Sequence, residues 1–181
     1  MAILGTTDSE HIAALYFFNL CGEDGDWTSI YPIDKMAETM TKTISQLEEM
    51  KSTAEKKAGK SENNALNLLV SSGVSLVALR YASPPDREPP SLYYSTTAGA
   101  TLNRKFKGHP DEGKPGAELS EGTKAKEEHG KHVIVGSEPN TFNADEWELI
   151  GRSETVVVGE DMSMVIRPLG LQGDQKASEK L

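Results

Sequence analysis

Three short runs of consecutive apolar residues limit what this chain can fold into more than any other feature of its sequence. The runs are Leu68-Leu69-Val70, Val133-Ile134-Val135 and Val156-Val157-Val158. Because side chains alternate between the two faces of a β-strand, a strand that is apolar at successive positions needs apolar cover on both faces. These runs therefore predict a layered fold in which a sheet is enclosed from two sides.

Two helices are predicted ahead of the strands. Thr7, followed by Glu10 three residues later, matches the capping box of a helix N-terminus, and residues 9–20 are apolar almost all round. Residues 34–57 carry apolar side chains at steps of three and four, Met50 among them, with Lys and Glu on the other side, and we predict that this apolar stripe is core. This pair covers one face of a sheet, and we expect that another layer must cover the second face.

Strand-like segments separated by turn residues occupy the rest of the chain. Residues 65–73 and 74–82 read as a hairpin, and further strands are predicted within residues 91–97, 132–139, 148–161 and 162–169. Two helices followed by five or six antiparallel strands predict an α+β fold.

Charge and composition exclude several classes of function. The net charge is −9, which argues against nonspecific binding to nucleic acid or to anionic membranes. No apolar run reaches the roughly 20 residues that cross a bilayer, and the first ten residues lack the basic segment of a secretory signal. A single cysteine, Cys21, excludes an internal disulfide framework. We expect a cytoplasmic protein with no nucleic-acid and no membrane partner.

Two segments differ in composition from the rest of the chain. Residues 103–131 hold five glycines, two prolines and thirteen charged residues, which predicts a flexible charged insertion. Residues 170–181 are polar and predict a disordered tail. His129 and His132 stand three apart within and beside the insertion, and we interpret that spacing as chance, so no metal and no cofactor are expected.

A set of motifs in this order resembles the C-terminal half of a class II glutamine amidotransferase domain. The motifs are TDSE at the first helix, NLLVSSG and ALRY in the hairpin, VIVGSEP, WELIGRSETVVV and IRPL. Within that family the chain is most similar to the glutamine-amidotransferase subunit of the fungal glutathione-degradation complex. The resemblance implies that residues 1–169 are the C-terminal part of such a domain. It also implies a partial four-layer α-β-β-α sandwich, with two helices on a mostly antiparallel sheet and the second layers incomplete.

The resemblance assigns one substrate-binding residue, Asp8. In class II amidotransferases the aspartate of the TDSE motif takes the α-ammonium of the glutamyl substrate, and a carboxylate suits that role through charge-assisted hydrogen bonds. The alternative is structural, because a negative charge in the first turn is stabilised by the helix dipole. Thr6, Thr7 and Glu10 are expected to hold the turn.

The family's reaction centre is not found in this sequence. Its members use an N-terminal cysteine whose thiolate attacks the γ-carboxamide, with the α-amino group as base and an Asn-Gly pair for the oxyanion. Here Ala2 follows Met1, and Cys21 lies beyond the first helix without a neighbouring histidine. We expect no catalytic residue in this chain and no turnover by the chain alone, and we interpret the sequence as a fragment of a longer enzyme. Ser137, Glu138 and Arg80 are interpreted as structural: Glu138 as a buried residue orienting a loop, and Arg80 as part of an ion pair.

Three hypotheses for the function follow from these observations. The leading one is an amidohydrolase of the glutamine-amidotransferase type that acts on γ-glutamyl bonds, as in glutathione degradation, with glutathione or glutamine as substrate. The second is a noncatalytic binding or regulatory subunit that pairs its open sheet with a partner chain through an exposed sheet face. The third is an α+β domain with no ligand.

Overall fold

The computed structural model describes residues 5–98, 131–141 and 144–171 of the 181-residue chain. Most of the predicted insertion at residues 103–131 and of the predicted tail at residues 170–181 lies outside the described residues. Helix α1 (Asp8–Cys21) and helix α2 (Ile33–Ala58) are joined by a loop, and the strands follow them. Both helices begin and end within a residue or two of the positions that the sequence predicts.

The N-terminus of α1 has half of the predicted capping box. Thr7 is the N-cap, and its hydroxyl oxygen accepts a hydrogen bond from the backbone N–H of Glu10 at 3.4 Å. The Glu10 carboxylate accepts from the backbone N–H of Gly5 at 2.9 Å, and not from Thr7 as a capping box requires. The motif therefore closes the turn that precedes the helix as well as its first turn.

Within the described residues, seven strands form two antiparallel sheets. The four-stranded sheet has the order β1-β2-β6-β7 and the three-stranded sheet the order β4-β3-β5. The bounds are β1 (Asn64–Ser71), β2 (Leu76–Ser83), β3 (Tyr93–Ser95), β4 (Ile134–Gly136), β5 (Glu148–Leu149), β6 (Glu154–Val158) and β7 (Met164–Pro168), with a short 3-10 helix η2 (Ala144–Glu146) before β5.

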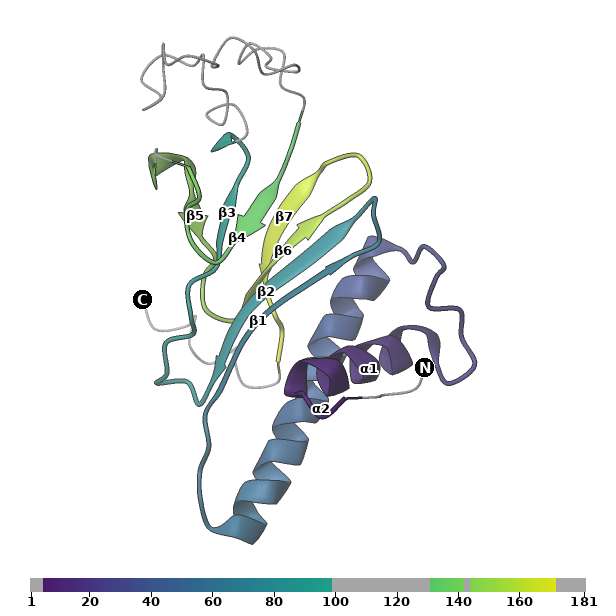
Figure 1. Cartoon of the computed structure of the whole chain (residues 1–181), viewed down its shortest axis with the longest axis vertical. Coiled ribbons are helices and arrows are strands. Elements are labelled where there is room, and N and C mark those ends of the chain that lie inside the picture. Colours follow the sequence, from purple (N-terminus) through teal and green to yellow (C-terminus); the bar gives the residue numbers. More distant parts are fainter. Residues whose placement is uncertain (1–4, 99–130, 142–143, 172–181) are drawn as a thin grey trace.

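The molecule has three layers: the small sheet, the large sheet and the helix pair (Figure 1). Strand β2 belongs to the large sheet, which lies between the small sheet and the helix pair, and all but its terminal residues are buried. Its side chains at Val77, Leu79 and Tyr81 belong to the core under the helices, together with Met40 and Ile44 of α2. These three residues are two positions apart, so their side chains point to the same face of the strand, the face toward the helices.

The second core lies between the two sheets and comes from the other face of the same strands. Its buried members are Ala78, Leu92, Tyr94, Ile150, Val156 and Val158. The second face of the large sheet is covered at its centre by another layer, as the apolar runs predict, and the short strands β3, β4 and β5 supply this layer. The fold class is as predicted: two helices on an antiparallel sheet, with a second layer that is small.

The edge strand β1 differs from the prediction for its apolar run. Leu68 packs against the helix-side core, whereas Leu69, on the opposite face, is 49% exposed. The run in β6 behaves as predicted, since Val156, Val157 and Val158 are all buried. The small sheet covers the central strands and leaves the edges open, so burial of an apolar run depends on its place in the sheet.

The segment at residues 148–161 was predicted as one strand and forms two in different sheets. The chain turns between β5 and β6 at Ser153, which has a positive φ of 56°. Backbone bonds pin this turn: the N–H of Ser153 donates to the Arg80 carbonyl at 2.8 Å, and the N–H of Leu169 donates to the Ser153 carbonyl at 2.7 Å. The turn carries the chain from the small sheet back to the large one.

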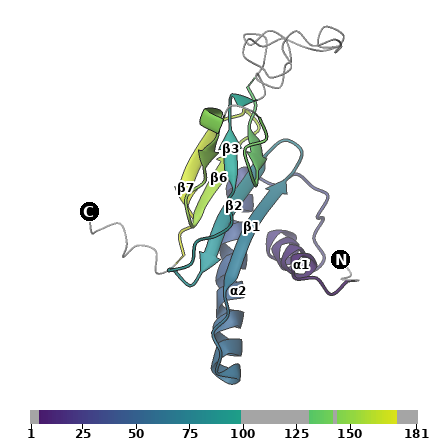
Figure 2. The same cartoon turned by 60° about the vertical axis from the view of Figure 1, so that its left-hand side comes forward.

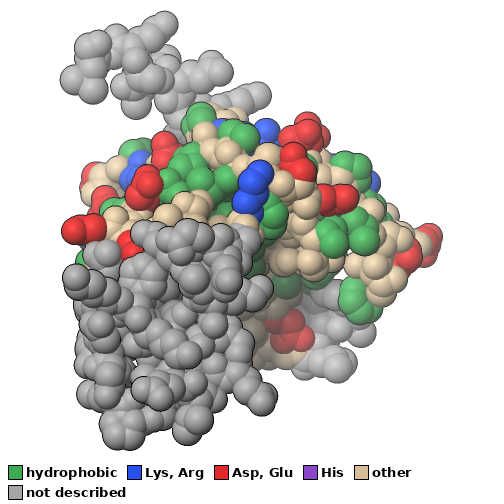
Figure 3. All heavy atoms as spheres, turned by 90° about the horizontal axis from the view of Figure 1, so that it is seen from above, with side chains coloured by type: hydrophobic (Ala, Val, Ile, Leu, Met, Phe, Trp, Pro, Cys, Tyr) green, Lys and Arg blue, Asp and Glu red, His purple; other side chains and the backbone are tan. Residues whose placement is uncertain are grey.

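No helix in the described part of the chain is both long enough and apolar enough to cross a membrane. On the face seen from above, the described acidic side chains are spread among hydrophobic ones, and Lys and Arg side chains are few and scattered (Figure 3). This distribution agrees with the net charge of −9.

Candidate functional site

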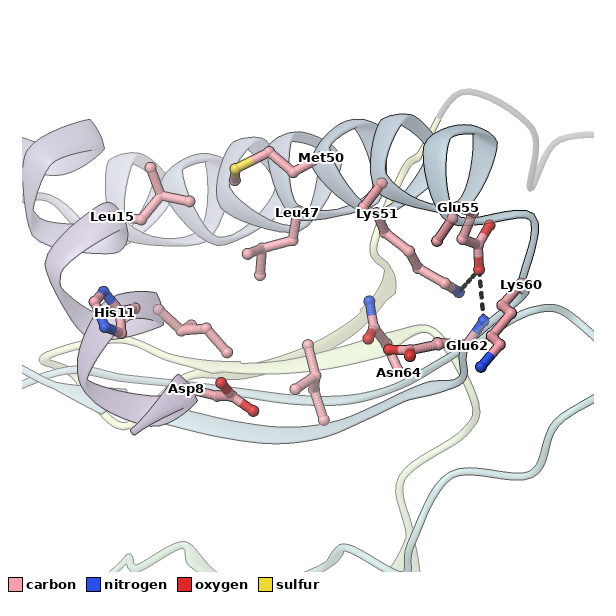
Figure 4. Close-up of a pocket in the computed structure, with 14 residues that line it drawn as sticks. Asp8, His11, Leu15, Leu47, Met50, Lys51, Glu55, Lys60, Glu62 and Asn64 are labelled. Atoms are coloured by element: carbon pink, nitrogen blue, oxygen red, sulfur yellow. Dashed lines mark hydrogen bonds and ion pairs between the residues drawn. The ribbon is translucent and has the colours of Figure 1, made fainter. Parts of the chain in front are cut away.

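An open groove of about 600 Å³ lies between α1, the C-terminal half of α2 and the start of β1 (Figure 4). The groove exists because the two ends of α2 have different surroundings. Its first half packs on the large sheet through Met36, Met40 and Ile44, whereas its last turns extend past the ends of the strands (Figures 1 and 2). The side chains of those last turns therefore line a groove rather than a core.

Asp8 lies at one end of this groove, in the first turn of α1, with its carboxylate directed toward the groove (Figure 4). The residue is exposed, and its side chain has no hydrogen-bonding or ion-pairing partner among the described residues. The Thr7 hydroxyl, and not Asp8, caps the helix. A carboxylate left unpaired at the rim of a groove is available to a cationic group of a ligand.

The floor of the groove is apolar and comes from three elements. Ile12 and Leu15 come from α1, Leu47, Met50 and Ala54 from α2, and Leu66 from β1. Met50 is 53% exposed, so the apolar stripe of α2 is only partly a core stripe. The sequence pattern predicted the whole stripe as core; the prediction is wrong at Met50 because the sheet ends before the helix does.

The far end of the groove is polar, and it holds the exposed Lys60 beside several groups that are bonded to one another. Lys51 donates to the Ser83 hydroxyl at 3.0 Å and lies 3.9 Å from a carboxylate oxygen of both Glu48 and Glu55. Asn64 donates to Glu48 at 3.2 Å. These bonds tie the end of α2 to the base of the β1–β2 hairpin, so this cluster has a structural role. Nothing in the local sequence pattern indicated it.

Glu55 extends the same cluster to the chain that leaves α2. Its carboxylate accepts from the backbone N–H of Glu62 at 2.8 Å and from the Ser61 hydroxyl at 3.1 Å. These bonds, with Lys51, hold the pKa of the Glu55 carboxyl below its ordinary value, the backbone bond from Glu62 being the largest cause. Glu55 is therefore ionised at neutral pH, and its carboxylate is already engaged in hydrogen bonds that stabilise the fold.

Other residues that the sequence singled out lie away from the groove. Cys21 is half-buried, and its sulfur donates to the Phe17 carbonyl at 3.0 Å. Glu138 is exposed, which corrects the prediction that it is buried, and it accepts from the Ser91 hydroxyl at 2.6 Å. Arg80 forms the ion pair that was predicted, with Glu88 at 2.6 Å.

The described residues support neither nucleophilic attack by a thiol or hydroxyl group in the groove nor the binding of a metal ion. No Cys, Ser or Thr is among the described residues that line the groove. Within the described ranges, no group of three or more His, Cys, Asp and Glu side chains is placed to hold a metal ion. His129 lies outside these ranges. The groove has the features of a binding site, with the unpaired Asp8 carboxylate at one end and an apolar floor.

Comparison with known proteins gives a match to solved structures. No protein-family profile matches the chain, and no curated protein matches it. A solved structure of a glutamine aminotransferase class-II domain protein from Silicibacter pomeroyi superposes with a TM-score of 0.52 and 18% sequence identity. The match covers 91% of this chain and 52% of that one, so the chain spans about half the length of the structure it resembles. At this identity the likeness concerns the fold, which is distantly related to that of the class II domain, and it carries no information on the fungal subgroup or on a substrate.

Proposed function

We propose that this chain binds the γ-glutamyl group of a small amide, with Asp8 pairing with its α-ammonium, as the substrate-binding part of a glutamine-amidotransferase-type amidohydrolase. The observation that carries the proposal is the unpaired Asp8 carboxylate at the end of the groove. The fold shared with a class-II domain protein supports it. Glutamine and glutathione, the substrates expected from the sequence, both contain this group.

The chemistry of the groove fits recognition better than turnover. An ammonium held by an unpaired carboxylate makes the strong class of hydrogen bond, whereas attack on the amide needs a nucleophile and a base in contact with it. The described groove residues supply the carboxylate of Asp8, and they include a histidine, His11, that can act as a base, but no Cys, Ser or Thr that can act as the nucleophile. In this proposal the attacking cysteine is contributed by polypeptide other than the described residues, and hydrolysis of γ-glutamyl bonds, including that of glutathione, requires it.

The test is a titration of the ¹⁵N-labelled chain, followed by NMR, with L-glutamine, glutathione and N-acetyl-L-glutamine. The first two ligands are expected to shift amide resonances of residues around the groove. The acetylated ligand lacks the ammonium and is expected to bind at least about tenfold more weakly, the factor expected for a lost charge-assisted bond.

A matched pair of variants isolates the carboxylate. Asp8→Asn is expected to weaken glutamine binding about tenfold or more, whereas Asp24→Asn, at an exposed loop position away from the groove, leaves it unchanged. Equal binding by Asp8→Asn and the unchanged protein, with only a slightly less stable helix, would instead support the structural reading of Asp8 as a first-turn charge.

A second candidate function is a noncatalytic subunit that pairs its sheet with another chain. It is favoured by the exposed apolar side chains on the two edge strands: Leu69 on β1, and Val165 and Ile166 on β7, are 49%, 55% and 39% exposed. Unpaired edges with apolar side chains are sites of strand pairing. Sedimentation velocity over a range of concentrations is expected to show association that Leu69→Lys weakens. A strict monomer at all concentrations speaks against self-pairing through this edge.

A further inference from the structure

We infer that the groove beyond Asp8 selects γ-glutamyl amides whose amine portion is an uncharged apolar chain, rather than the unsubstituted amide of glutamine or the charged Cys-Gly portion of glutathione. This inference rests on the proposed function, because Asp8 fixes the ammonium end of the ligand. It concerns the rest of the ligand, for which neither the fold nor the TDSE motif assigns a site.

The first step is the direction in which a ligand extends from Asp8. Asp8 lies at one end of the groove, and the apolar side chains of α1 and α2 lie between it and the polar cluster at the other end (Figure 4). Leu15 and Leu47 face each other across this space from the two helices, and Leu66 borders it from β1. A ligand tethered at Asp8 that fills the groove therefore places its distal atoms on hydrocarbon.

The second step concerns which polar groups remain for a ligand. Lys51 is bonded to Ser83 and flanked by Glu48 and Glu55, and its side chain is only 12% exposed. The Glu55 carboxylate is taken by the Glu62 N–H and the Ser61 hydroxyl. The cation best placed to meet a carboxylate at the far end is thus already neutralised. A charged amine portion would lose water at Lys51 without gaining an unengaged partner. The other cation at this end, Lys60, is exposed to solvent, where an ion pair with a ligand carboxylate contributes little.

The third step is the size of the groove. Its volume of about 600 Å³ lies in the range of sites that bind small organic molecules. Glutamine leaves the apolar stretch unfilled, because its amide carries no substituent. Burial of apolar surface by a branched alkyl group is the remaining source of affinity.

The test compares two ligands that differ only in this portion, γ-L-glutamyl-methylamide and γ-L-glutamyl-isoamylamide, by NMR titration of the ¹⁵N-labelled chain. The isoamylamide is expected to bind at least about tenfold more tightly, as for four carbons partly buried in an open groove. Its resonance changes are expected to include Met50 and Leu47.

A pair of variants on α2 locates the contact. Ala54→Asp places a charge on the groove floor and is expected to abolish the advantage of the isoamylamide over the methylamide. Ser52→Asp, an exposed position two residues away that does not line the groove, is expected to retain the full advantage. Met50→Gln, which keeps the side-chain length and removes apolarity at an exposed position, is expected to reduce it.

Other results of these titrations would contradict either the apolar selection or the proposed function. If both amides bind equally and Asp8→Asn weakens both, the apolar selection is wrong and the proposed function stands. If neither binds, the proposed function fails, and this inference fails with it. If the isoamylamide binds more tightly but Ala54→Asp and Ser52→Asp behave alike, the alkyl group lies outside this groove and the inference is wrong.

Discussion

Arg80 is the residue that joins the large sheet to the small one. It is 4% exposed, and its guanidinium donates to three backbone carbonyls, those of Pro89, Pro90 and Ile150, at 2.9–3.1 Å, as well as to Glu88. The carbonyls belong to the chain that enters β3 and to the residue that follows β5. The sequence indicated an ion pair here, and the structure adds the carbonyls, which no pattern in the strand could reveal.

Replacing Arg80 by Met is expected to lower the free energy of unfolding by roughly 3 kcal/mol, because the carbonyls of Pro89 and Ile150 lose a buried donor and that of Pro90 loses a partly buried one. Urea unfolding followed by circular dichroism measures the loss. Glu88→Gln is the control: the Glu88 side chain is 74% exposed, so the charge pair itself is worth less than about 1 kcal/mol. Equal losses in the two variants would show that the ion pair, and not the carbonyl bonds, provides the stability.

Tyr94 is buried between the sheets, and its hydroxyl donates to the Glu148 carboxylate at 2.6 Å. Burial, followed by this hydrogen bond and the negative charges of Glu148 and Glu154, raises the pKa of Tyr94 to about 12 from an ordinary value of 10.0. The phenol thus keeps its proton in the folded protein at a pH where an unfolded chain has lost it.

The raised pKa of Tyr94 predicts a loss of stability at high pH. Its contribution is fully present below pH 10 and is lost as the pH rises through the interval between 10 and about 12, because only the unfolded state gives up the proton there. Melting temperatures measured from pH 9 upward are expected to fall less steeply for Tyr94→Phe, which cannot titrate. Since burial also raises the pKa of Tyr16 to about 12, Tyr16→Phe should flatten the profile too. Parallel profiles for all three proteins would contradict this assignment.

At the scale of elements, α2 divides into a half that packs and a half that lines the groove. Its polar and apolar positions were predictable from their spacing, because helical periodicity is a local property. Where the sheet under α2 ends depends on distant residues and was not predictable from this spacing. The prediction of a core residue therefore fits Leu47 and is wrong for Met50. The helix end itself is marked in the sequence by Gly59.

Gly59 ends α2 in the left-handed conformation, with φ of 66°, and its N–H donates to the Glu55 carbonyl at 2.8 Å. Gly59→Ala is expected to cost about 1 kcal/mol of stability, because a Cβ disfavours this conformation. Gly59→Asn is expected to cost less, since asparagine tolerates it. Thermal unfolding of the two variants checks the order, and a loss that is no larger for alanine than for asparagine would contradict the cap.

At the scale of the whole molecule, the small sheet decides whether the large one is covered. Ile150 is 1% exposed in the core between the sheets, whereas its neighbour Leu149 is 48% exposed on the outer side of the small sheet. The two residues have similar apolar side chains and opposite surroundings. They therefore test whether this layer is an integral part of the fold.

Ile150→Ala is expected to destabilise the protein by about 3 kcal/mol, the usual cost of a cavity in a packed core. Leu149→Ala is expected to cost less than about 1 kcal/mol because the side chain is half in water. Chemical denaturation of both variants measures the difference. Similar small losses would mean that the small sheet packs loosely and that the inner face of the large sheet is open after all.

The sequence by itself determined the type, order and approximate ends of the helices and most strands, because spacing, caps and turn residues act over a few positions. It also pointed to Asp8 through the TDSE motif. Only the tertiary structure decided that β3, β4 and β5 cover β2 and β6 and that Leu69 stays exposed at an edge of the sheet. It also decided that α2 extends past the end of the sheet and leaves a groove. These outcomes depend on contacts between residues far apart in the chain, whose energies are not written in any local pattern.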